Sequence, residues 1–132
     1  MDKIIRIGTR SSELALWQAN TVAKQLDGLG YKSEIVKIDS IGDVVLDKPL
    51  YELGITGVFT KNLDIALLND KIDIAVHSFK DVPTKLPHGI VEAAILKRGD
   101  FSDVLVIKED ENFFTNETAT IATGSLRRKA QW

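Results

Sequence analysis

The sequence predicts an α/β domain with a mostly parallel sheet and flanking helices. Short runs rich in β-branched residues alternate along the chain with segments of helical period. Polar and glycine-containing segments follow several of these runs directly, as they do where parallel strands end. With 44% hydrophobic and 27% charged residues, the composition is that of an ordinary globular domain. A length of 132 residues suits one domain with the start of a second.

The first predicted strand spans Ile4 to Thr9, an apolar run interrupted by Arg6. A helix is expected from Glu13, with Ser12 as its N-cap. Its apolar face repeats at spacings of four and three residues and comprises Ala15, Ala19, Val22, Leu26 and Leu29. The glycines at positions 28 and 30 should end this helix.

Tyr31 to Ile38 alternates in polarity and predicts a second strand. Asp39 to Gly57 has no clear period and is expected to be a long functional loop, with or without a helical turn at Leu50 to Leu53. Phe59 to Asn69 predicts a second helix. The apolar face of that helix would contain Phe59, Leu63, Ala66 and Leu67.

Ile72 to Val76 is almost entirely apolar and predicts a central strand covered on both faces. Pro83 prevents this strand from running on, because proline lacks a backbone donor. Three further strands are expected at Ile90 to Leu96, Val104 to Ile107 and Thr120 to Thr123. A last helix should start after Gly124-Ser125, and the turn near Arg98 is the best candidate for a domain boundary.

Charge and cysteine content exclude several classes of protein. The 17 basic and 19 acidic residues give a net charge of −2, which argues against a basic domain that coats nucleic acid and against an acidic disordered tail. The chain has no cysteine, so disulfides, thiolate zinc sites, iron–sulfur clusters and cysteine nucleophiles are excluded within it. No metal site is predicted, and no apolar run suggests a signal peptide or a membrane span.

Three segments occupy positions where ligands bind in open α/β sheets, beyond the carboxyl ends of strands. They are Thr9-Arg10-Ser11-Ser12, His77-Ser78-Phe79-Lys80-Asp81 and Thr123-Gly124-Ser125-Leu126-Arg127-Arg128. The first and third combine hydroxyls and arginine at a helix start, which suits a carboxylate or phosphate. The alternative is that the serines only cap helices and the arginines are solvated.

The second segment places Lys80 beside Asp81. A carboxylate next to a cation stays ionised and can stabilise a developing positive charge or move a proton. The alternative is a surface ion pair of little energetic value. We interpret His77 as a packed, hydrogen-bonded histidine, and we assign Trp17 and Phe79 to the core.

At these segments the sequence resembles the porphobilinogen deaminase (hydroxymethylbilane synthase) family. The motifs that carry the resemblance are Ile7-Gly8-Thr9-Arg10-Ser11-Ser12, Gly57-Val58-Phe59-Thr60-Lys61, Asp73 to Pro83, and Gly124-Ser125-Leu126-Arg127-Arg128. The resemblance implies two periplasmic-binding-protein-like (type II) domains around a cleft, and a third, smaller domain. Residues 1–98 would form domain 1 and residues 99–132 the beginning of domain 2, with the cofactor-attachment domain absent.

The resemblance also implies an activity, head-to-tail condensation of four porphobilinogen molecules with release of ammonia, followed by hydrolysis to hydroxymethylbilane. The product would grow on a dipyrromethane cofactor held by a cysteine in the third domain. Asp81 would then be the catalytic carboxylate. The residues expected to bind the cofactor are Arg10, Ser11, Ser78, Lys80, Ser125, Arg127 and Arg128. Those expected to bind substrate are Arg10, Lys61, Arg127 and Arg128.

Two departures from the family pattern concern these contacts. Ile55-Thr56 stands where relatives often carry a lysine, and Ala122-Thr123-Gly124-Ser125 replaces the commoner Gly-Thr-Ser-Ser. Family members are more than twice as long, so the resemblance implies that the chain is a fragment. We expect it to be inactive on its own, because it cannot attach the cofactor, and we expect the parent enzyme to be cytoplasmic and monomeric. The rival hypothesis is a non-catalytic domain that captures an anionic metabolite.

Overall fold

The computed structural model describes residues 3–39, 60–107, 115 and 120–131. The chain divides into two compact units, Met1–Ile95 and Leu96–Trp132. The predicted loop lies outside the described residues after Asp39, as does the helical turn expected at Leu50 to Leu53. The assignment of residues 1–98 and 99–132 to two functional domains stays a prediction.

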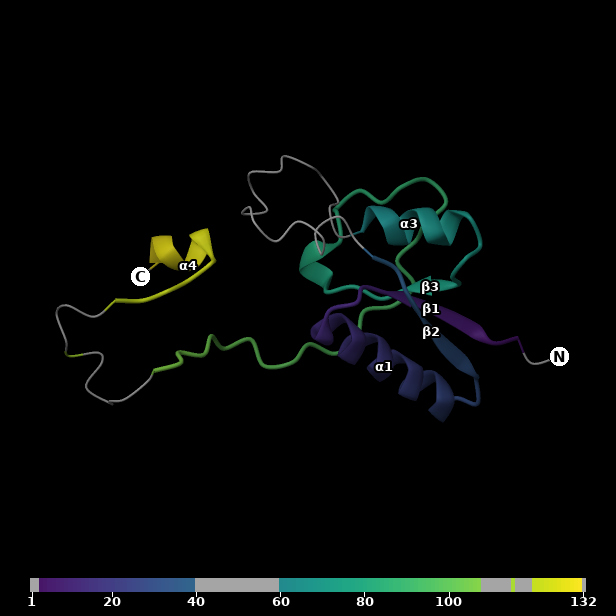
Figure 1. The fold of residues 1–132 in the computed structure, drawn as a ribbon, viewed down its shortest axis with the longest axis horizontal. Helices are drawn as coiled ribbons and strands as arrows, with labels where there is room; N and C mark the ends of the chain where they lie inside the picture. The colour runs from purple at the N-terminus through teal and green to yellow at the C-terminus, as the bar shows by residue number, and fades with distance from the viewer. Residues whose placement is uncertain (1–2, 40–59, 108–114, 116–119, 132) are drawn as a thin grey trace. The chain divides into compact units, whose positions relative to one another are not determined.

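The first unit is built on a parallel sheet whose strands are ordered β2-β1-β3 (Figure 1). β1 (Ile5–Thr9) pairs with β2 (Ser33–Lys37) on one side and with β3 (Ile74–Ala75) on the other, both in parallel. The predicted α/β class and parallel sheet are therefore confirmed for the first unit.

Helix α1 (Glu13–Gly28) begins where the sequence predicts. The Ser12 hydroxyl accepts a hydrogen bond from the N–H of Ala15 at 3.4 Å, which satisfies one of the unpaired donors of the first turn. Ala15 and Ala19 are buried, as expected from the helical period. Leu29, also assigned to this face, is 73% exposed because it lies beyond the last helical residue.

The end of α1 is a Schellman motif. Gly30 has a φ of 85° and donates its N–H to the carbonyl of Asp27 at 2.9 Å. The N–H of Tyr31 reaches back to the carbonyl of Leu26 at 2.9 Å. Only glycine adopts such a positive φ without strain, so the predicted role of Gly30 in ending the helix is confirmed.

The core forms where helix α3 (Lys61–Leu68) covers the sheet (Figure 1). Leu63 and Ala66 are buried on α3 and pack with Ile72, which lies just before β3. A Cβ on Gly8 would lie 2.9 Å from Cδ2 of Leu63 and would overlap Ile72. The absence of a side chain at Gly8 thus allows α3 and the segment before β3 to approach β1 closely.

The opposite face of β1 meets α1. The hydroxyl of Thr9, fully buried, donates to the carbonyl of Ala15 at 3.1 Å. Ile7 is also fully buried, and it alternates with Gly8 along the strand. Sheet, α1 and α3 therefore form three layers in this unit.

The predicted central position of Ile72 to Val76 is wrong for the described sheet. Its paired part, Ile74–Ala75, is the edge strand, and β1 is central. The apolar character of this run is explained in part by Ile72, which lies before the strand and is buried against Leu63 and Ala66 of α3. As expected, the strand ends before Pro83, and a 3₁₀ turn, η2 (Phe79–Asp81), follows.

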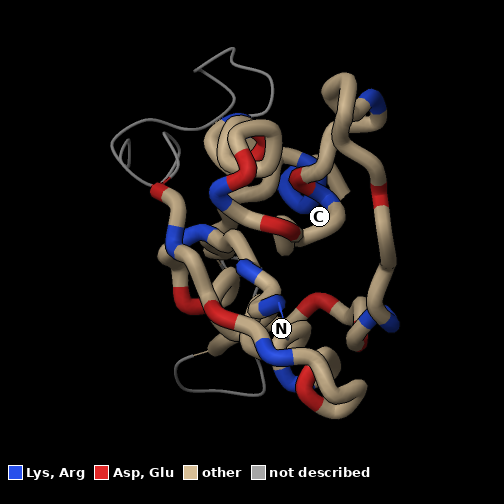
Figure 2. Tube along the Cα trace, turned by 90° about the vertical axis from the view of Figure 1, so that its right-hand side faces the viewer, with Lys and Arg blue, Asp and Glu red and all other residues tan. Residues whose placement is uncertain are grey.

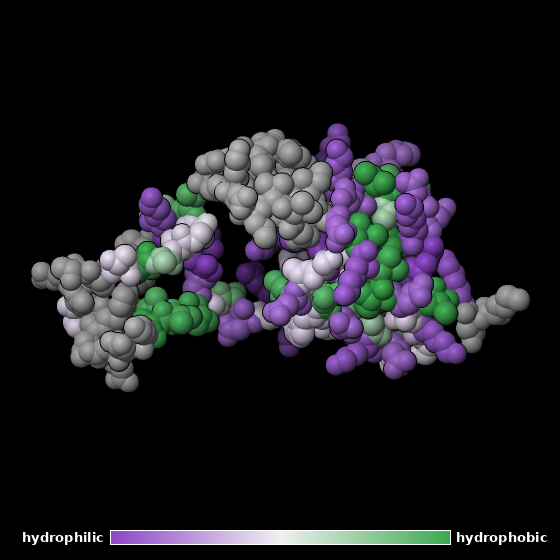
Figure 3. Space-filling view, viewed as in Figure 1, coloured by the Kyte–Doolittle hydropathy of each residue, from purple (hydrophilic) through white to green (hydrophobic). Residues whose placement is uncertain are grey.

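The three later strands are not formed. The segments 90–96, 104–107 and 120–123 contain no strand, and Val91, Val104 and Val106 are each more than 80% exposed. An apolar β-branched run becomes a strand only when its backbone pairs with a neighbouring segment, and among the described residues these runs have no such partner. Their apolar side chains are left exposed, and Figure 3 shows hydrophobic residues at the surface of the described chain.

The second unit contains helix α4 (Leu126–Gln131), which starts as predicted. The Ser125 hydroxyl accepts from the N–H of Arg128 at 3.3 Å, and the Thr123 hydroxyl accepts from the N–H of Ser125 at 3.2 Å. Within the described ranges, no helix has the length and apolar character needed to cross a bilayer.

Candidate functional site

The described strands are parallel, so their carboxyl ends meet at one edge of the sheet. Arg10 and Ser11 follow β1 at this edge, Asp39 lies shortly after β2, and His77 and Ser78 lie shortly after β3. The first two predicted segments are thereby brought together, and Arg10 of the first acts electrostatically on His77 of the second. We call this region the carboxyl edge.

Ser11 is held by a residue that sequence reasoning did not select. Its hydroxyl donates to Oδ1 of Asp39 at 3.0 Å. Asn62 of α3 in turn donates its side-chain amide to the backbone carbonyl of Asp39 at 2.6 Å. Asp39 therefore connects the start of α1 with the start of α3. Its position directly after a predicted strand was the only sequence signal for such a role.

Ser78 is paired with Gln18, a second residue that sequence reasoning did not assign to the site. The amide Nε2 of Gln18 donates to Oγ of Ser78 at 3.1 Å, and Oγ lies 3.2 Å from Oε1 of the same amide. Both residues are partly buried. The contact joins the middle of α1 to the segment between β3 and η2.

His77 is partly buried near three charged groups, which are Arg10 after β1, Asp64 on α3 and Asp81 in η2. Burial is the main cause that lowers its pKa, Arg10 lowers it further, and Asp64 and Asp81 oppose the shift. On α3, burial raises the pKa of Asp64, against the effects of His77 and of a hydrogen bond from Thr60. The burial of His77 supports its interpretation as a packed residue, and its neighbours place Arg10 and Asp81 in one electrostatic environment.

The turn η2 carries the Lys80-Asp81 pair. The N–H of Asp81 donates to the carbonyl of Ser78 at 2.9 Å, which fixes the turn. Asp81 is partly buried, and Lys80 is exposed. Phe79 is 60% exposed and Trp17 of α1 is 65% exposed, so the assignment of both aromatic residues to the core is wrong.

Lys61 is the first residue of α3 and is exposed. It lines a shallow groove between α3 and the segment after η2. The other lining residues are Thr60, Asp64, Ile65, Leu68, Pro83, Lys85 and Pro87. Lys61 thus lies next to Asp64, one of the carboxylates that face His77.

In the second unit the predicted arginines have intramolecular partners. Arg128 forms an ion pair with Asp103, which lowers the pKa of that carboxyl and raises the pKa of Arg128. Arg127 donates to Oε1 of Gln131 at 3.3 Å. The alternative for Ser125, that it caps a helix, matches its hydrogen bond from Arg128. Any anion bound by Arg128 would compete with Asp103.

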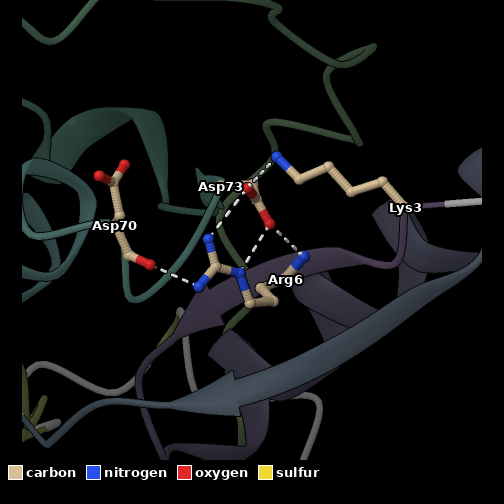
Figure 4. Close-up of polar contacts among 4 residues, drawn as sticks. All are labelled: Lys3, Arg6, Asp70 and Asp73. Atoms are coloured by element: carbon tan, nitrogen blue, oxygen red, sulfur yellow. Dashed lines mark hydrogen bonds and ion pairs between the residues drawn. The ribbon is translucent and has the colours of Figure 1, made fainter.

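A separate ionic cluster lies at the amino end of the sheet (Figure 4). Arg6 of β1 donates from Nε to Oδ2 of Asp73 at 2.9 Å, and Lys3 lies 2.7 Å from Oδ1. The hydrogen bond from Arg6 is the main cause that holds the pKa of Asp73 well below its usual range. Arg6 also donates to the carbonyl of Asp70.

Charges of both signs are interspersed along the described trace (Figure 2). In that part of the chain, no three acidic or histidine side chains cluster in a way that could hold a metal ion. The carboxyl edge instead combines hydroxyls, the guanidinium of Arg10, the ammonium of Lys80 and the carboxylates of Asp39 and Asp81. Such a set can bind an anionic group and stabilise a positive charge beside it.

Comparison with known proteins shows what the chain as a whole is similar to. Residues 5–132 match the family model described as "Porphobilinogen deaminase, dipyromethane cofactor binding domain". The chain is 52% identical over 127 residues to the probable porphobilinogen deaminase of Methanocaldococcus jannaschii, covering 96% of this chain and 43% of that protein. It is 47% identical over 131 residues to the porphobilinogen deaminase of Orientia tsutsugamushi, covering 97% and 44%. For the porphobilinogen deaminase of Geobacter sulfurreducens the identity is 46% over 129 residues, covering 96% and 41%. The chain therefore spans less than half the length of these relatives.

Proposed function

The chain belongs to the porphobilinogen deaminase family, and from this membership we propose that it forms the first part of an enzyme of tetrapyrrole synthesis. That enzyme joins four porphobilinogen molecules head to tail, releases ammonia at each addition and hydrolyses the product to hydroxymethylbilane. The match of the family model to residues 5–132 is the observation that carries the proposal.

The proposed architecture has two periplasmic-binding-protein-like domains around a cleft. The parallel β2-β1-β3 sheet with α1 and α3 on its two faces supports this fold for residues 1–98. Residues 99–132 would begin the second domain. A third domain would provide the cysteine that attaches the cofactor, since this chain has none.

Asp81 is the proposed catalytic carboxylate. When ammonia leaves porphobilinogen, the carbon–nitrogen bond breaks with its electron pair on nitrogen, and positive charge develops on the pyrrole. A carboxylate fixed nearby stabilises that charge. The hydrogen bond from Asp81 N–H to the Ser78 carbonyl supports this role, because it fixes the backbone of Asp81 at the carboxyl edge.

The donor chemistry of the carboxyl edge suits the carboxylates of a dipyrromethane, because each pyrrole carries an acetate and a propionate. In the first unit the proposed cofactor contacts are Arg10, Ser11, Ser78 and Lys80, and in the second they are Ser125, Arg127 and Arg128. When bound, this cofactor supplies the pyrrole carbon on which the product grows.

The carboxylates of porphobilinogen itself would be bound by four cations. These residues are Arg10, Lys61, Arg127 and Arg128. Lys61 supports this assignment by its exposed position at the first turn of α3, where the helix dipole also favours an anion. Arg128 would exchange its contact with Asp103 for the ligand.

A chimera tests the proposed function. In it, the 127 matched residues of the Methanocaldococcus jannaschii relative are replaced by the matching part of this chain. We expect the chimera to consume porphobilinogen and to yield uroporphyrin after oxidation, and its mass to include a dipyrromethane. The unmodified relative is the positive control. A folded chimera that carries no added mass and forms no product would contradict the proposal and favour an anion-binding domain.

The chain on its own is proposed to be inactive, because it has no cysteine to attach the cofactor. Incubation with porphobilinogen followed by the same assay should give no product above the level without protein, and any turnover would refute this point.

We further propose a cytoplasmic, monomeric enzyme, and gel filtration of the chimera tests the oligomeric state.

A further inference from the structure

The contact between Gln18 and Ser78 links the helix after β1 to the segment after β3. The Ser78 hydroxyl oxygen lies 3.1 Å from Nε2 and 3.2 Å from Oε1 of the Gln18 amide. Both polar atoms of the Gln18 side chain therefore contact the same hydroxyl. Both residues are partly buried, so the contact is shielded from much of the solvent that would compete with it.

The hydrogen of the Ser78 hydroxyl can point either at Gln18 or at a ligand, so this contact has two hydrogen-bonding states. A hydroxyl has one hydrogen to donate and two lone pairs that accept. When its hydrogen points at Oε1 of Gln18, Ser78 has no hydrogen left for a ligand. When the hydrogen turns to a ligand carboxylate, Nε2–H of Gln18 still donates to Oγ, and this donation increases the polarity of the hydroxyl.

The same contact also affects the turn that follows. The carbonyl of Ser78 accepts from the N–H of Asp81 at 2.9 Å, so the position of Ser78 influences that of Asp81. Gln18 is fixed in turn by its helix, where neighbouring Ala15 and Ala19 are buried. Helix α1 therefore fixes the position of Gln18, and the part of the contact that can change direction is the hydroxyl hydrogen of Ser78.

We propose that Gln18 is a positioning residue, whose side-chain amide holds the Ser78 hydroxyl in place to hydrogen-bond a ligand carboxylate at the carboxyl edge. This inference rests on the proposed function, in which Ser78 binds a carboxylate of the cofactor. Gln18 acts through Ser78 and needs no contact with the ligand for this role.

The test is a double-variant cycle in the chimera, with Gln18→Met, Ser78→Ala and the two combined. Methionine keeps the length of the side chain and removes both hydrogen-bonding atoms. We expect Gln18→Met to lower kcat/KM about fivefold to tenfold, the loss that corresponds to about one neutral hydrogen bond. The combined variant should be no worse than Ser78→Ala, because Gln18 acts only through that hydroxyl.

Asn20→Ala is the matched control, because Asn20 is an amide on the same helix whose side chain donates, within the described part of the chain, to the Leu16 carbonyl at 2.8 Å, one turn away. It should retain the activity of the chimera. Wild-type activity in Gln18→Met, or losses that multiply in the combined variant, would overturn the inference. Multiplied losses would mean that Gln18 acts independently of Ser78.

A second cycle measures the contact without any activity. The same variants are made in the 132-residue chain, and their urea unfolding is compared. A nonzero coupling between Gln18→Met and Ser78→Ala is expected, and independent effects would also overturn the inference. If the chimera were inactive but the two substitutions were coupled in urea unfolding, the proposed function would be wrong while the contact between Gln18 and Ser78 would be supported.

Discussion

Arg6 and Asp73, 67 residues apart, are joined by two side-chain contacts and two backbone contacts. The guanidinium donates from Nε at 2.9 Å and from Nη2 at 3.1 Å to the two carboxylate oxygens. The Arg6 N–H also donates to the carboxylate at 2.9 Å, and the Asp73 N–H donates to the Arg6 carbonyl at 2.9 Å. The two charges that interrupt apolar runs in the sequence therefore pair with each other at the start of β1 and β3.

The ion pair predicts acid sensitivity. Since Arg6 holds the pKa of Asp73 below its usual range, the contribution to stability is present above the unfolded pKa of about 3.9 and is lost as the pH falls towards the folded pKa. We expect Asp73→Asn to lower the melting temperature at neutral pH and to approach wild type below about pH 4. Asp27→Asn, on the exposed end of α1, is the control. A difference that persists unchanged into acid would contradict this account.

The close packing at Gly8 predicts a destabilising effect of one added methyl group. In Gly8→Ala the new Cβ would lie 2.9 Å from Leu63 and would overlap Ile72, so side chains or backbone must shift. We expect a loss of about 1–3 kcal/mol in the free energy of unfolding, measured with urea. Gly28→Ala is the control, because a Cβ there meets nothing within 4 Å and alanine favours the helix. Equal free energies of unfolding for the two variants would show that the core accommodates the added methyl group without loss of stability.

The burial of His77 predicts a second pH effect, nearer to neutrality. Its folded pKa lies below the unfolded value of about 6.5, so the folded chain binds fewer protons and loses stability as the pH falls from about 6.5. We expect His77→Gln to flatten the stability curve in this interval. Urea unfolding at closely spaced pH values measures it, and a slope identical to wild type would argue against the effect.

The placement of Asp81 predicts its effect on turnover. In the chimera, Asp81→Asn removes the charge but preserves the size of the side chain, and we expect activity to fall by about 10²- to 10⁴-fold. Asp27→Asn should retain activity, because Asp27 is exposed near the end of α1. Initial rates of porphobilinogen consumption provide the comparison. If both variants turned over equally, Asp81 would have no catalytic role.

Local sequence rules predicted the elements whose stability is local. Helix α1 carries its own signals, from the Ser12 cap to Gly30 at the Schellman turn, and it forms where they indicate. Strands depend on a partner, and so the strand predictions for the apolar runs around Val91 and Val104 are wrong. Ile72 to Val76 was assigned to the centre of the sheet because burial against helix α3 leaves the same apolar signature as burial between strands.

The difference between local signals and contacts with distant segments also explains which residues of the carboxyl edge could be predicted. Arg10, Ser78 and Asp81 could be selected because each follows a predicted strand within a few residues. Gln18 could not, because its partner lies 60 residues away and nothing in the helical pattern marks its amide. Asp39 does follow a predicted strand, but its position alone did not reveal its partner, because Ser11 lies 28 residues away at the end of another strand.

The strand order β2-β1-β3 also governs when the unit can fold during synthesis. Among the described strands the last in the sequence pairs with the first, so Gly8 cannot complete its pairing with Ala75 until Ala75 has left the ribosome. Ile72, which covers Gly8, arrives at the same stage. Nascent chains stalled before Ile72 should accordingly stay protease-sensitive, and those that expose Ala75 should become resistant in one step.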